Sequence, residues 1–374
     1  MSARYDVIIV GAGPGGAMAA CALGQAGCRV LVLERQEWPR YKPCGGAIPA
    51  RVFDSLPMAC AQTIERRVTR VRFQLGEEQV CHDLHGAVAM VMRSRFDATL
   101  LAQAQATVHA GEGVTGLEEG SHGIEVQTSH GRYQADYVVG ADGASSVVAR
   151  AAGLRQGHVL GAALEAELAV PERLLEEFAE TALFLFGAVA DGYLWVFPKA
   201  DHLSVGIGTF RNPGHQLRQR LEEGVRRLGL PAGLRPRGHA LPVYRRCEPL
   251  QRGRVLLVGD AAGLMDPLSG EGIRHALHSG RLAAQAILGG RVHEYSEQVY
   301  QAIGADLGAC LWLARSFYAL PHLSFRLGVR DPAIVGAMMR MLSGQTGYRQ
   351  LIRQVPRYFL RKLLRRGQVD WGPM

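Results

Sequence analysis

The chain has 374 residues, of which 48% are hydrophobic and 20% charged, a composition typical of globular domains that excludes an intrinsically disordered protein. No uninterrupted apolar run of about 18 residues occurs and no apolar leader follows Arg4, so we expect a cytoplasmic protein without a transmembrane helix. The net charge is +8, but the basic residues do not alternate with aromatic side chains as in DNA- or RNA-binding modules, so no nucleic-acid partner is expected.

The first predicted elements are a strand, a glycine-rich turn, a helix and a second strand. The turn after residues 5–10 contains four glycines: Gly11, Gly13, Gly15 and Gly16. In this fingerprint the first glycine permits a tight turn, the second lets backbone N–H groups approach a pyrophosphate, and the last lets the helix pack on the strand. Glu34 ends the second strand, where its carboxylate can accept hydrogen bonds from ribose hydroxyls. The pattern predicts a dinucleotide-binding unit.

The remaining elements divide the chain into three parts. Residues 51–90 are expected to be irregular with short strands, followed by a helix from Arg93 and a small antiparallel meander up to residue 139. A second sheet follows, interrupted by a helix at 214–228, and the chain is expected to be helical after 273. The expected units are a discontinuous nucleotide-binding domain (1–153 and 246–290), an antiparallel-sheet domain (154–245) and a helical carboxyl-terminal region (291–374).

A second strand and turn, far along the chain, is predicted to bind the same nucleotide. The apolar residues 254–258 precede Gly259 and Asp260, whose carboxylate is suited to accept a hydrogen bond from a sugar or ribityl hydroxyl. A helix then opens at Gly272 and Ile273, and its N-terminus has the positive potential that suits the negative charge of a reduced flavin. The two glycine-rich elements together predict FAD.

Seven cysteines are scattered without Cys-x-x-Cys spacing, which argues against a disulfide framework and a zinc site. The histidines show no spacing typical of ligands either, so no metal is expected. Six cysteines are interpreted as buried or incidental thiols. Cys44 differs, because it stands between Pro43 and two glycines.

These motifs resemble those of the flavoproteins related to p-hydroxybenzoate hydroxylase, and most closely the geranylgeranyl reductase family. The motifs that carry the resemblance are the two glycine-rich elements, residues 140–146, Lys42-Pro43-Cys44-Gly45-Gly46, residues 192–199 with the pattern Tyr-x-Trp-x-Phe-Pro, and residues 267–273. The resemblance covers residues 5–350. It implies an α/β fold in which a Rossmann-type FAD-binding domain carries an inserted antiparallel-sheet substrate domain and a helical carboxyl-terminal region.

The resemblance also implies which residues contact FAD. Besides the fingerprint glycines Gly11 and Gly13, they are Ala12, Gly15, Gly16, Glu34, Cys44, Gly45, Arg93, Val114, Asp260, Gly272 and Ile273. One position departs from the family pattern Asp-Gly-x-x-Ser-x-x-Arg. Ala149 occupies the last place and the arginine falls at Arg150, which leaves open what that arginine binds.

The candidate catalytic residues are Cys44, Tyr193 and Trp195. A thiol beside the flavin can shape the pocket, protonate a carbon or simply pack, and all three roles stay open for Cys44. Tyr193, Trp195 and Phe197 alternate along a strand and therefore point to one face. With Pro198 they match the family stretch that lines a long apolar tunnel, although a half-buried sheet face would show the same alternation.

The leading hypothesis is an FAD-dependent reductase that saturates carbon–carbon double bonds of an isoprenoid chain, such as that of a prenyl lipid. An FAD-dependent aromatic or lipid monooxygenase is the alternative, and a flavin-bearing binding protein without turnover is a third. No second nucleotide fingerprint marks a domain for NADPH, so NADPH, a ferredoxin or a quinol all remain electron donors to test.

The carboxyl-terminal segment is basic and amphipathic. Seven cations alternate with apolar residues between Arg349 and Arg366. Such a segment either lies on an anionic membrane surface, giving a peripheral membrane protein, or forms an ordinary solvated helix face.

Overall fold

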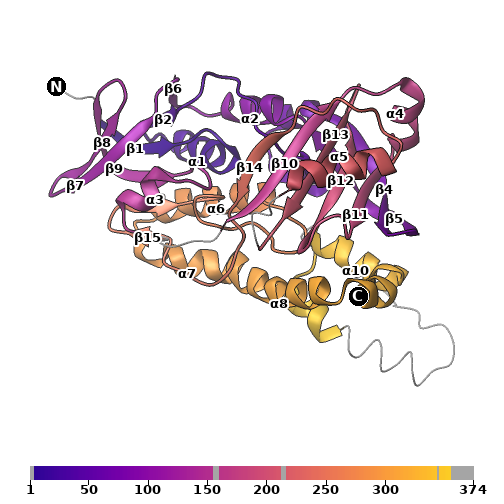
Figure 1. Ribbon diagram of the computed structural model, residues 1–374. Coiled ribbons are helices and arrows are strands. Elements are labelled where there is room, and N and C mark those ends of the chain that lie inside the picture. Colours follow the sequence, from indigo (N-terminus) through magenta and orange to yellow (C-terminus); the bar gives the residue numbers. More distant parts are fainter. Residues whose placement is uncertain (1–3, 155–159, 212–215, 343–344, 355–374) are drawn as a thin grey trace.

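The computed structural model describes residues 4–154, 160–211, 216–342 and 345–354. Two sheets lie side by side, and a layer of helices crosses beneath both (Figure 1). This arrangement confirms the predicted α/β class, with a Rossmann-type sheet, a second largely antiparallel sheet and a helical carboxyl-terminal region.

The first sheet has a parallel core in the order β16-β9-β1-β2-β6. The strands β1, β2 and β16 are rich in Val, Leu and Ile and largely buried, as expected where both faces of a parallel sheet are covered. The bounds of the core strands are β1 Arg4–Val10, β2 Val30–Glu34, β6 Thr107–Ala110, β9 Arg132–Gly140 and β16 Val255–Leu257. The expected meander is formed by β9 with β7 (Val114–Gly120) and β8 (Gly123–Thr128), and β15 (Gln251–Arg252) extends the edge.

Helix α1 (Pro14–Gln25) follows β1 and packs closely on α6 (Ile273–Leu288). A side chain at Gly280 would place its Cβ 2.2 Å from the carbonyl oxygen of Gly15, so the two backbones touch. Strand β1 lies between β2 and β9. The chain passes from β1 to β2 on one side and returns to the sheet as β9 on the other side, so a crevice forms at the carboxyl ends of these strands. Two shorter helices complete this part: α2 (Arg93–Leu101) and α3 (Val147–Ala151).

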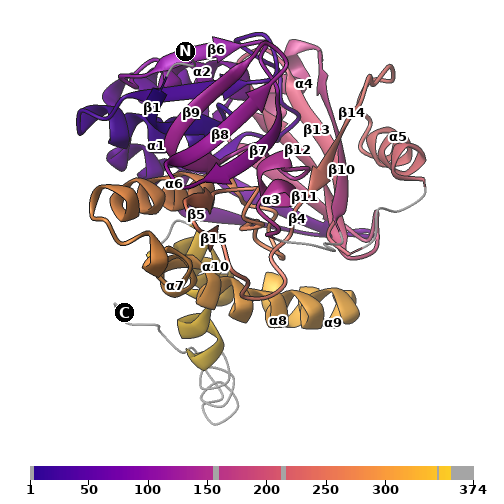
Figure 2. The same cartoon turned by 90° about the vertical axis from the view of Figure 1, so that its left-hand side faces the viewer.

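The second sheet has eight strands in the order β14-β10-β13-β12-β11-β4-β5-β3 (Figure 2). All neighbours are antiparallel except β11 and β4. The bounds are β3 Ala47–Pro49, β4 Ile64–Leu75, β5 Glu78–Val91, β10 Gly161–Leu168, β11 Thr181–Phe186, β12 Gly192–Pro198, β13 Leu203–Thr209 and β14 Arg237–Leu241.

The expectation of an irregular segment with short strands at residues 51–90 was wrong. After two 3₁₀ turns, η1 (Ala50–Ser55) and η2 (Met58–Thr63), the chain forms strands of 12 and 14 residues that pair with each other. Both strands belong to the second sheet, because β4 also pairs with β11 more than a hundred residues later.

Helices cover both faces of the second sheet. Helices α4 (Glu172–Phe178) and α5 (Leu217–Arg227) bury one face through the aliphatic core that includes Leu194 and Val205. The other face carries aromatic side chains that contact the carboxyl-terminal helices. The bounds of the carboxyl-terminal elements are η3 Val292–Glu294, α7 Tyr295–Val299, η4 Tyr300–Gly304, α8 Ala305–Ala319, α9 Pro321–Ser324, η5 Phe325–Val329 and α10 Pro332–Leu342.

Most of the basic carboxyl-terminal segment, residues 355–366, lies outside the described residues. Within the described ranges, no helix is both long and apolar enough to cross a membrane.

Candidate functional site

The turn after β1 has no room for side chains. Gly11 has a φ of 101°, and a Cβ there would lie 2.4 Å from the carbonyl oxygen of Ala141. A Cβ on Gly16 would lie 2.0 Å from the oxygen of Gly11. Gly13 is the N-cap of α1 and makes no side-chain hydrogen bond to the first N–H groups of the helix. A helix N-terminus after such a glycine turn is suited to a pyrophosphate, as the sequence predicts.

Glu34 ties the glycine turn to the end of β2. Its carboxylate is 5% exposed and accepts hydrogen bonds from the backbone N–H of Ala12 at 3.0 Å and from Nε of Arg40 at 3.2 Å. The backbone of Glu112, two residues before Val114, donates to the Glu34 carbonyl. Glu34 and Val114 are therefore near one another, at the ribose side of the predicted nucleotide site.

A buried ion-pair network continues from Arg40. Arg93 donates to both oxygens of Asp97 at 2.8 and 2.7 Å, and Arg40 approaches the same carboxylate at 3.3 Å. Burial by itself lowers the pKa of Arg93, but the Asp97 carboxylate outweighs it and raises the pKa overall. The Arg93 guanidinium also interacts with the thiol of Cys44, so the structure brings these two predicted residues together.

Asp260 lies at the other end of the crevice. Its carboxylate accepts a hydrogen bond from Nζ of Lys42 at 3.0 Å and lies 3.7 Å from Nε2 of His239. Burial opposes ionisation, but the Lys42 ammonium and His239 hold the pKa of Asp260 below its usual range. The ionised carboxylate is a strong acceptor for a hydroxyl group. Gly272, the N-cap of α6, is adjacent, because a Cβ there would lie 3.6 Å from Oδ1 of Asp260.

The Cys44-Gly45-Gly46 loop rests on the aromatic strand β12. A Cβ on Gly45 would lie 2.7 Å from the ring of Phe197 and 3.2 Å from Nε1 of Trp195. The buried ammonium of Lys199 stabilises this loop by donating a hydrogen bond to the carbonyl oxygen of Gly45. The loop predicted to contact the flavin and the predicted substrate strand are thus in direct contact.

Tyr193, Trp195 and Phe197 share one face of β12, as predicted, and are 5–8% exposed. Their rings pack with Phe184 of the neighbouring strand, whose centroid lies 5.1 Å from Tyr193 and 5.2 Å from Phe197. The Tyr193 hydroxyl donates to the carbonyl oxygen of Ser269, in the loop before Gly272 and Ile273. The indole Nε1 of Trp195 is buried and has no hydrogen-bond partner among the described residues. Pro198 ends the strand.

A polar group on the same sheet face was not predicted. Glu165 of β10 is 1% exposed and accepts hydrogen bonds from the hydroxyls of Tyr41, at 2.5 Å, and Ser204, at 3.0 Å. Strand pairing places it in one row with Trp195, across Gly206. Burial, together with the nearby Glu167 carboxylate, raises the pKa of Glu165 to about 7.

Lys42, Lys199 and Glu165 were missed because their partners are distant in the sequence. Lys42 lies 218 residues from Asp260, and Lys199 lies 154 residues from Gly45. The only local signal was that both lysines lie inside the motifs that carry the family resemblance.

Comparison with known proteins identifies the family. The family described as FAD binding domain matches residues 4–287. The chain is 31% identical over 337 residues to an uncharacterized protein of Methanosarcina barkeri, covering 87% of this chain and 86% of that protein. It is 32% identical over 317 residues to the chloroplastic geranylgeranyl diphosphate reductase of Oryza sativa subsp. japonica, covering 77% of this chain and 67% of that relative.

The fold also has a solved counterpart. A geranylgeranyl bacteriochlorophyll reductase-like protein from Thermoplasma acidophilum superposes with a TM-score of 0.76 at 22% identity, covering 95% of this chain and 96% of that structure. The glycine turn and its two flanking carboxylates fit FAD, and the sequence similarity extends over most of the chain. The chain therefore belongs to the geranylgeranyl reductase family of FAD-dependent oxidoreductases.

Proposed function

We propose that this oxidoreductase saturates carbon–carbon double bonds of an isoprenoid chain. Bound FAD, when reduced, supplies the hydride for this addition. The observation that supports the proposal is the contact of Gly45 with Trp195 and Phe197, because these aromatic side chains then lie against the loop that we assign to the flavin. A polyprenyl chain offers almost no polar groups and therefore favours a wall of such side chains. The relative named geranylgeranyl diphosphate reductase supports the same reaction class.

Cys44 is our candidate for the proton donor. Saturation of a double bond adds a hydride to one carbon and a proton to the other, and the thiol lies in the loop that contacts the aromatic wall. The guanidinium of Arg93 interacts with this thiol. After proton transfer, the thiol regains a proton from solvent.

Tyr193 is a weaker candidate for the proton donor than Cys44. Burial raises the pKa of its hydroxyl, and that hydroxyl already donates to the carbonyl of Ser269. We assign Tyr193 and Phe197, with Pro198, to the wall that orients the chain and excludes water. The indole N–H of Trp195, which has no hydrogen-bond partner among the residues that the structure describes, is available to a polar atom of the flavin or substrate.

The reaction is tested by anaerobic incubation of photoreduced enzyme with prenyl lipids, followed by mass spectrometry. A gain of two hydrogens per double bond in one lipid class is the expected result. No gain in any class would contradict the proposal, and oxygen-dependent hydroxylation of a substrate would favour the monooxygenase alternative. The same assay, run with NADPH, a reduced ferredoxin or a quinol in place of light, identifies the electron donor.

The role of Cys44 has its own test. Cys44→Ser is expected to lower kcat by about 10²-fold or more, because positioned proton transfer contributes factors of that size. Cys81→Ser, at an exposed cysteine, is the matched control. If the two variants have the same kcat, Cys44 is a packing residue and water or Tyr193 supplies the proton.

We also propose peripheral membrane contact, since prenyl lipids reside in membranes. Besides the basic segment, large apolar side chains are exposed on the carboxyl-terminal helices, including Trp312 at 64%, Leu320 at 59% and Leu323 at 51%. Sedimentation with phosphatidylglycerol vesicles tests this contact. Trp312→Glu combined with Leu320→Glu is expected to reduce the bound fraction, and an unchanged fraction would argue against this face.

A further inference from the structure

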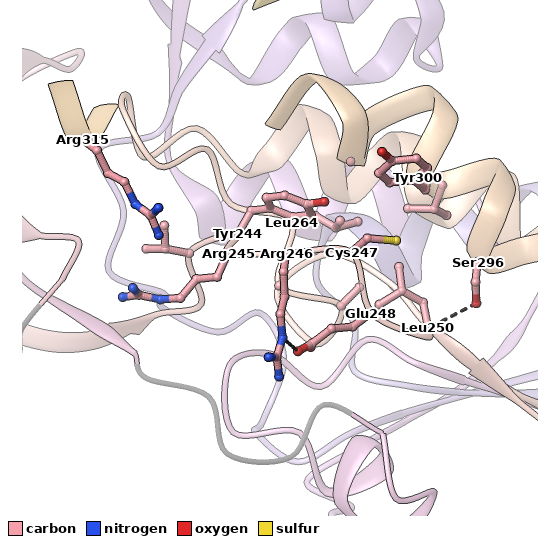
Figure 3. A pocket seen from close by; sticks show the side chains of 15 residues that line it. Tyr244, Arg245, Arg246, Cys247, Glu248, Leu250, Leu264, Ser296, Tyr300 and Arg315 are labelled. Carbon is pink, nitrogen blue, oxygen red and sulfur yellow. Dashed lines mark hydrogen bonds and ion pairs between the residues drawn. The ribbon is translucent and has the colours of Figure 1, made fainter. Parts of the chain in front are cut away.

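A cavity of about 340 Å³ lies between the segment 243–250 and helices α7 and α8 (Figure 3). Three arginines line it. Arg246 is neutralised by Glu248, at 2.6 Å. Arg245 and Arg315 lie together at the end away from Tyr300 (Figure 3), and no carboxylate of the described residues is within ion-pair distance of either. This end of the cavity therefore has uncompensated positive charge.

Arg245 has an unused donor at this end. One terminal nitrogen donates to the carbonyl of Phe210 at 3.1 Å, but its Nε is buried and has no hydrogen-bond partner in the part of the chain that the structure describes. Burial, and the neighbouring cations Arg211 and Arg315, lower the pKa of Arg245. A bound anion would satisfy the buried N–H and relieve the repulsion among the cations.

Arg245 and Arg315 lie near the aromatic side chains of the second sheet. A smaller cavity of about 20 Å³ shares Arg245 and Arg315 and is also lined by Phe210, by Tyr318 and by the ion pair of Arg211 with Asp191, at 3.5 Å. The ring of Phe210 lies 5.8 Å from Tyr193 and 6.1 Å from Tyr318, centroid to centroid. The rings of Phe210 and Tyr318 thus lie between the two arginines and Tyr193, and they must rotate to pass an isoprenoid chain.

We propose that Arg245 and Arg315 bind the phosphate or diphosphate head group of the substrate while its isoprenoid chain passes Phe210 toward Tyr193. This assignment rests on the proposed reduction of isoprenoid chains. It adds that two arginines outside the FAD cradle hold the phosphorylated head group and select such a substrate over the corresponding alcohol.

The test compares three substrates with FAD-loaded wild type, with Arg245→Ala combined with Arg315→Ala, and with Arg246→Ala. The substrates are geranylgeranyl diphosphate, a geranylgeranylated glycerophospholipid and geranylgeraniol. The double variant is expected to raise KM for the phosphorylated substrate about 10- to 100-fold, with kcat nearly unchanged, because charge-assisted hydrogen bonds to the head group are lost. KM for geranylgeraniol stays unchanged, and Arg246→Ala behaves as wild type. The phosphorylated compound with the lower wild-type KM identifies the source of the head group.

Several outcomes overturn the assignment. One is an equal change of KM for alcohol and phosphorylated substrates, or none for either. Another is a raised KM for NADPH alone, which would make the arginines a site for the electron donor. If wild type reduces none of the three compounds, the proposed function fails, and calorimetry with inorganic pyrophosphate decides the site by itself. If wild type binds pyrophosphate and the double variant binds it at least tenfold more weakly, the two arginines form an anion site. If wild type does not bind pyrophosphate, the assignment of an anion site is wrong.

Discussion

The ammonium of Lys199 donates a hydrogen bond to the carbonyl oxygen of Gly45 at 2.8 Å and a second to Val91 at 2.7 Å. Lys199 is fully buried, and it joins β12 and the end of β5 to the loop that carries Cys44. The predicted flavin loop is thus anchored by a residue of the predicted substrate sheet.

Replacing Lys199 by methionine should release this loop. Lys199→Met leaves two carbonyl groups without their donor, so we expect the free energy of unfolding to fall by about 2–4 kcal/mol and FAD to bind more weakly. Urea denaturation and flavin fluorescence titration measure the two effects. Arg67→Met, at an exposed cation on β4, is the control and should change stability by less than about 0.5 kcal/mol. Equal effects in both variants would mean that the ammonium does not anchor the loop.

The fit of Gly45 against the aromatic wall gives a second prediction. In Gly45→Ala the new Cβ would lie 2.7 Å from the ring of Phe197, so either the loop or the ring must move. We expect a loss of about 1–3 kcal/mol of stability and reduced FAD content in the purified protein, read from the ratio of flavin to protein absorbance. Gly131→Ala is the control, because no atom lies within 4 Å of its added Cβ. A normal flavin content in Gly45→Ala would show that the wall tolerates displacement.

A substitution at Glu34 tests the end of the site that is predicted to bind the ribose of the nucleotide. Glu34→Gln removes the charge that holds the N–H of Ala12 and the guanidinium of Arg40, and it weakens the acceptor for ribose hydroxyls. We expect the Kd for FAD to rise about 10- to 100-fold. The fold should persist, because Arg40 keeps Asp97 as a partner at 3.3 Å. Glu37→Gln, at an exposed carboxylate nearby, should leave the Kd unchanged, and a similar Kd in both variants would count against Glu34.

The parts of the site that follow local patterns were predictable from the sequence. Gly11 and Glu34 lie where a strand, a turn and a helix of ordinary length must place them, and the alternation of Tyr193, Trp195 and Phe197 fixes their common face. The strand pairing of β4 was not predictable. Its partner β11 is distant in the sequence, and polar residues such as Arg70 interrupt its apolar pattern.

The same reasoning explains the missed polar residues. Tyr41 and Glu165 are 124 residues apart, and neither belongs to a local motif with a known partner. Burial of a carboxylate depends on which loop covers the strand, and that is set by the packing of two sheets rather than by β10 itself. Resemblance to a family implies the FAD contacts, whereas the hydrogen bonds around them depend on the packing of segments that are distant in the sequence.

Glu165 gives a prediction about pH. Burial and the Glu167 carboxylate raise its pKa from 4.5 to about 7 in the folded protein. Between these values the unfolded chain releases the proton while the folded chain keeps it, so this group makes the folded state progressively less stable as the pH rises through the window. The loss reaches at most about 3 kcal/mol above pH 7. Glu165→Gln cannot ionise and keeps an acceptor for Tyr41, so it should lack this dependence.

The measurement is urea denaturation of wild type and Glu165→Gln at pH 5 and pH 8. The variant should gain stability relative to wild type between the two values, since only wild type has a buried carboxylate to ionise at pH 8. Glu176→Gln, at an exposed carboxylate on α4, corrects for the effect of one charge on the whole molecule. If the difference between Glu165→Gln and wild type is the same at both pH values, Glu165 is ionised throughout, and the Tyr41 hydroxyl stabilises a carboxylate rather than an acid.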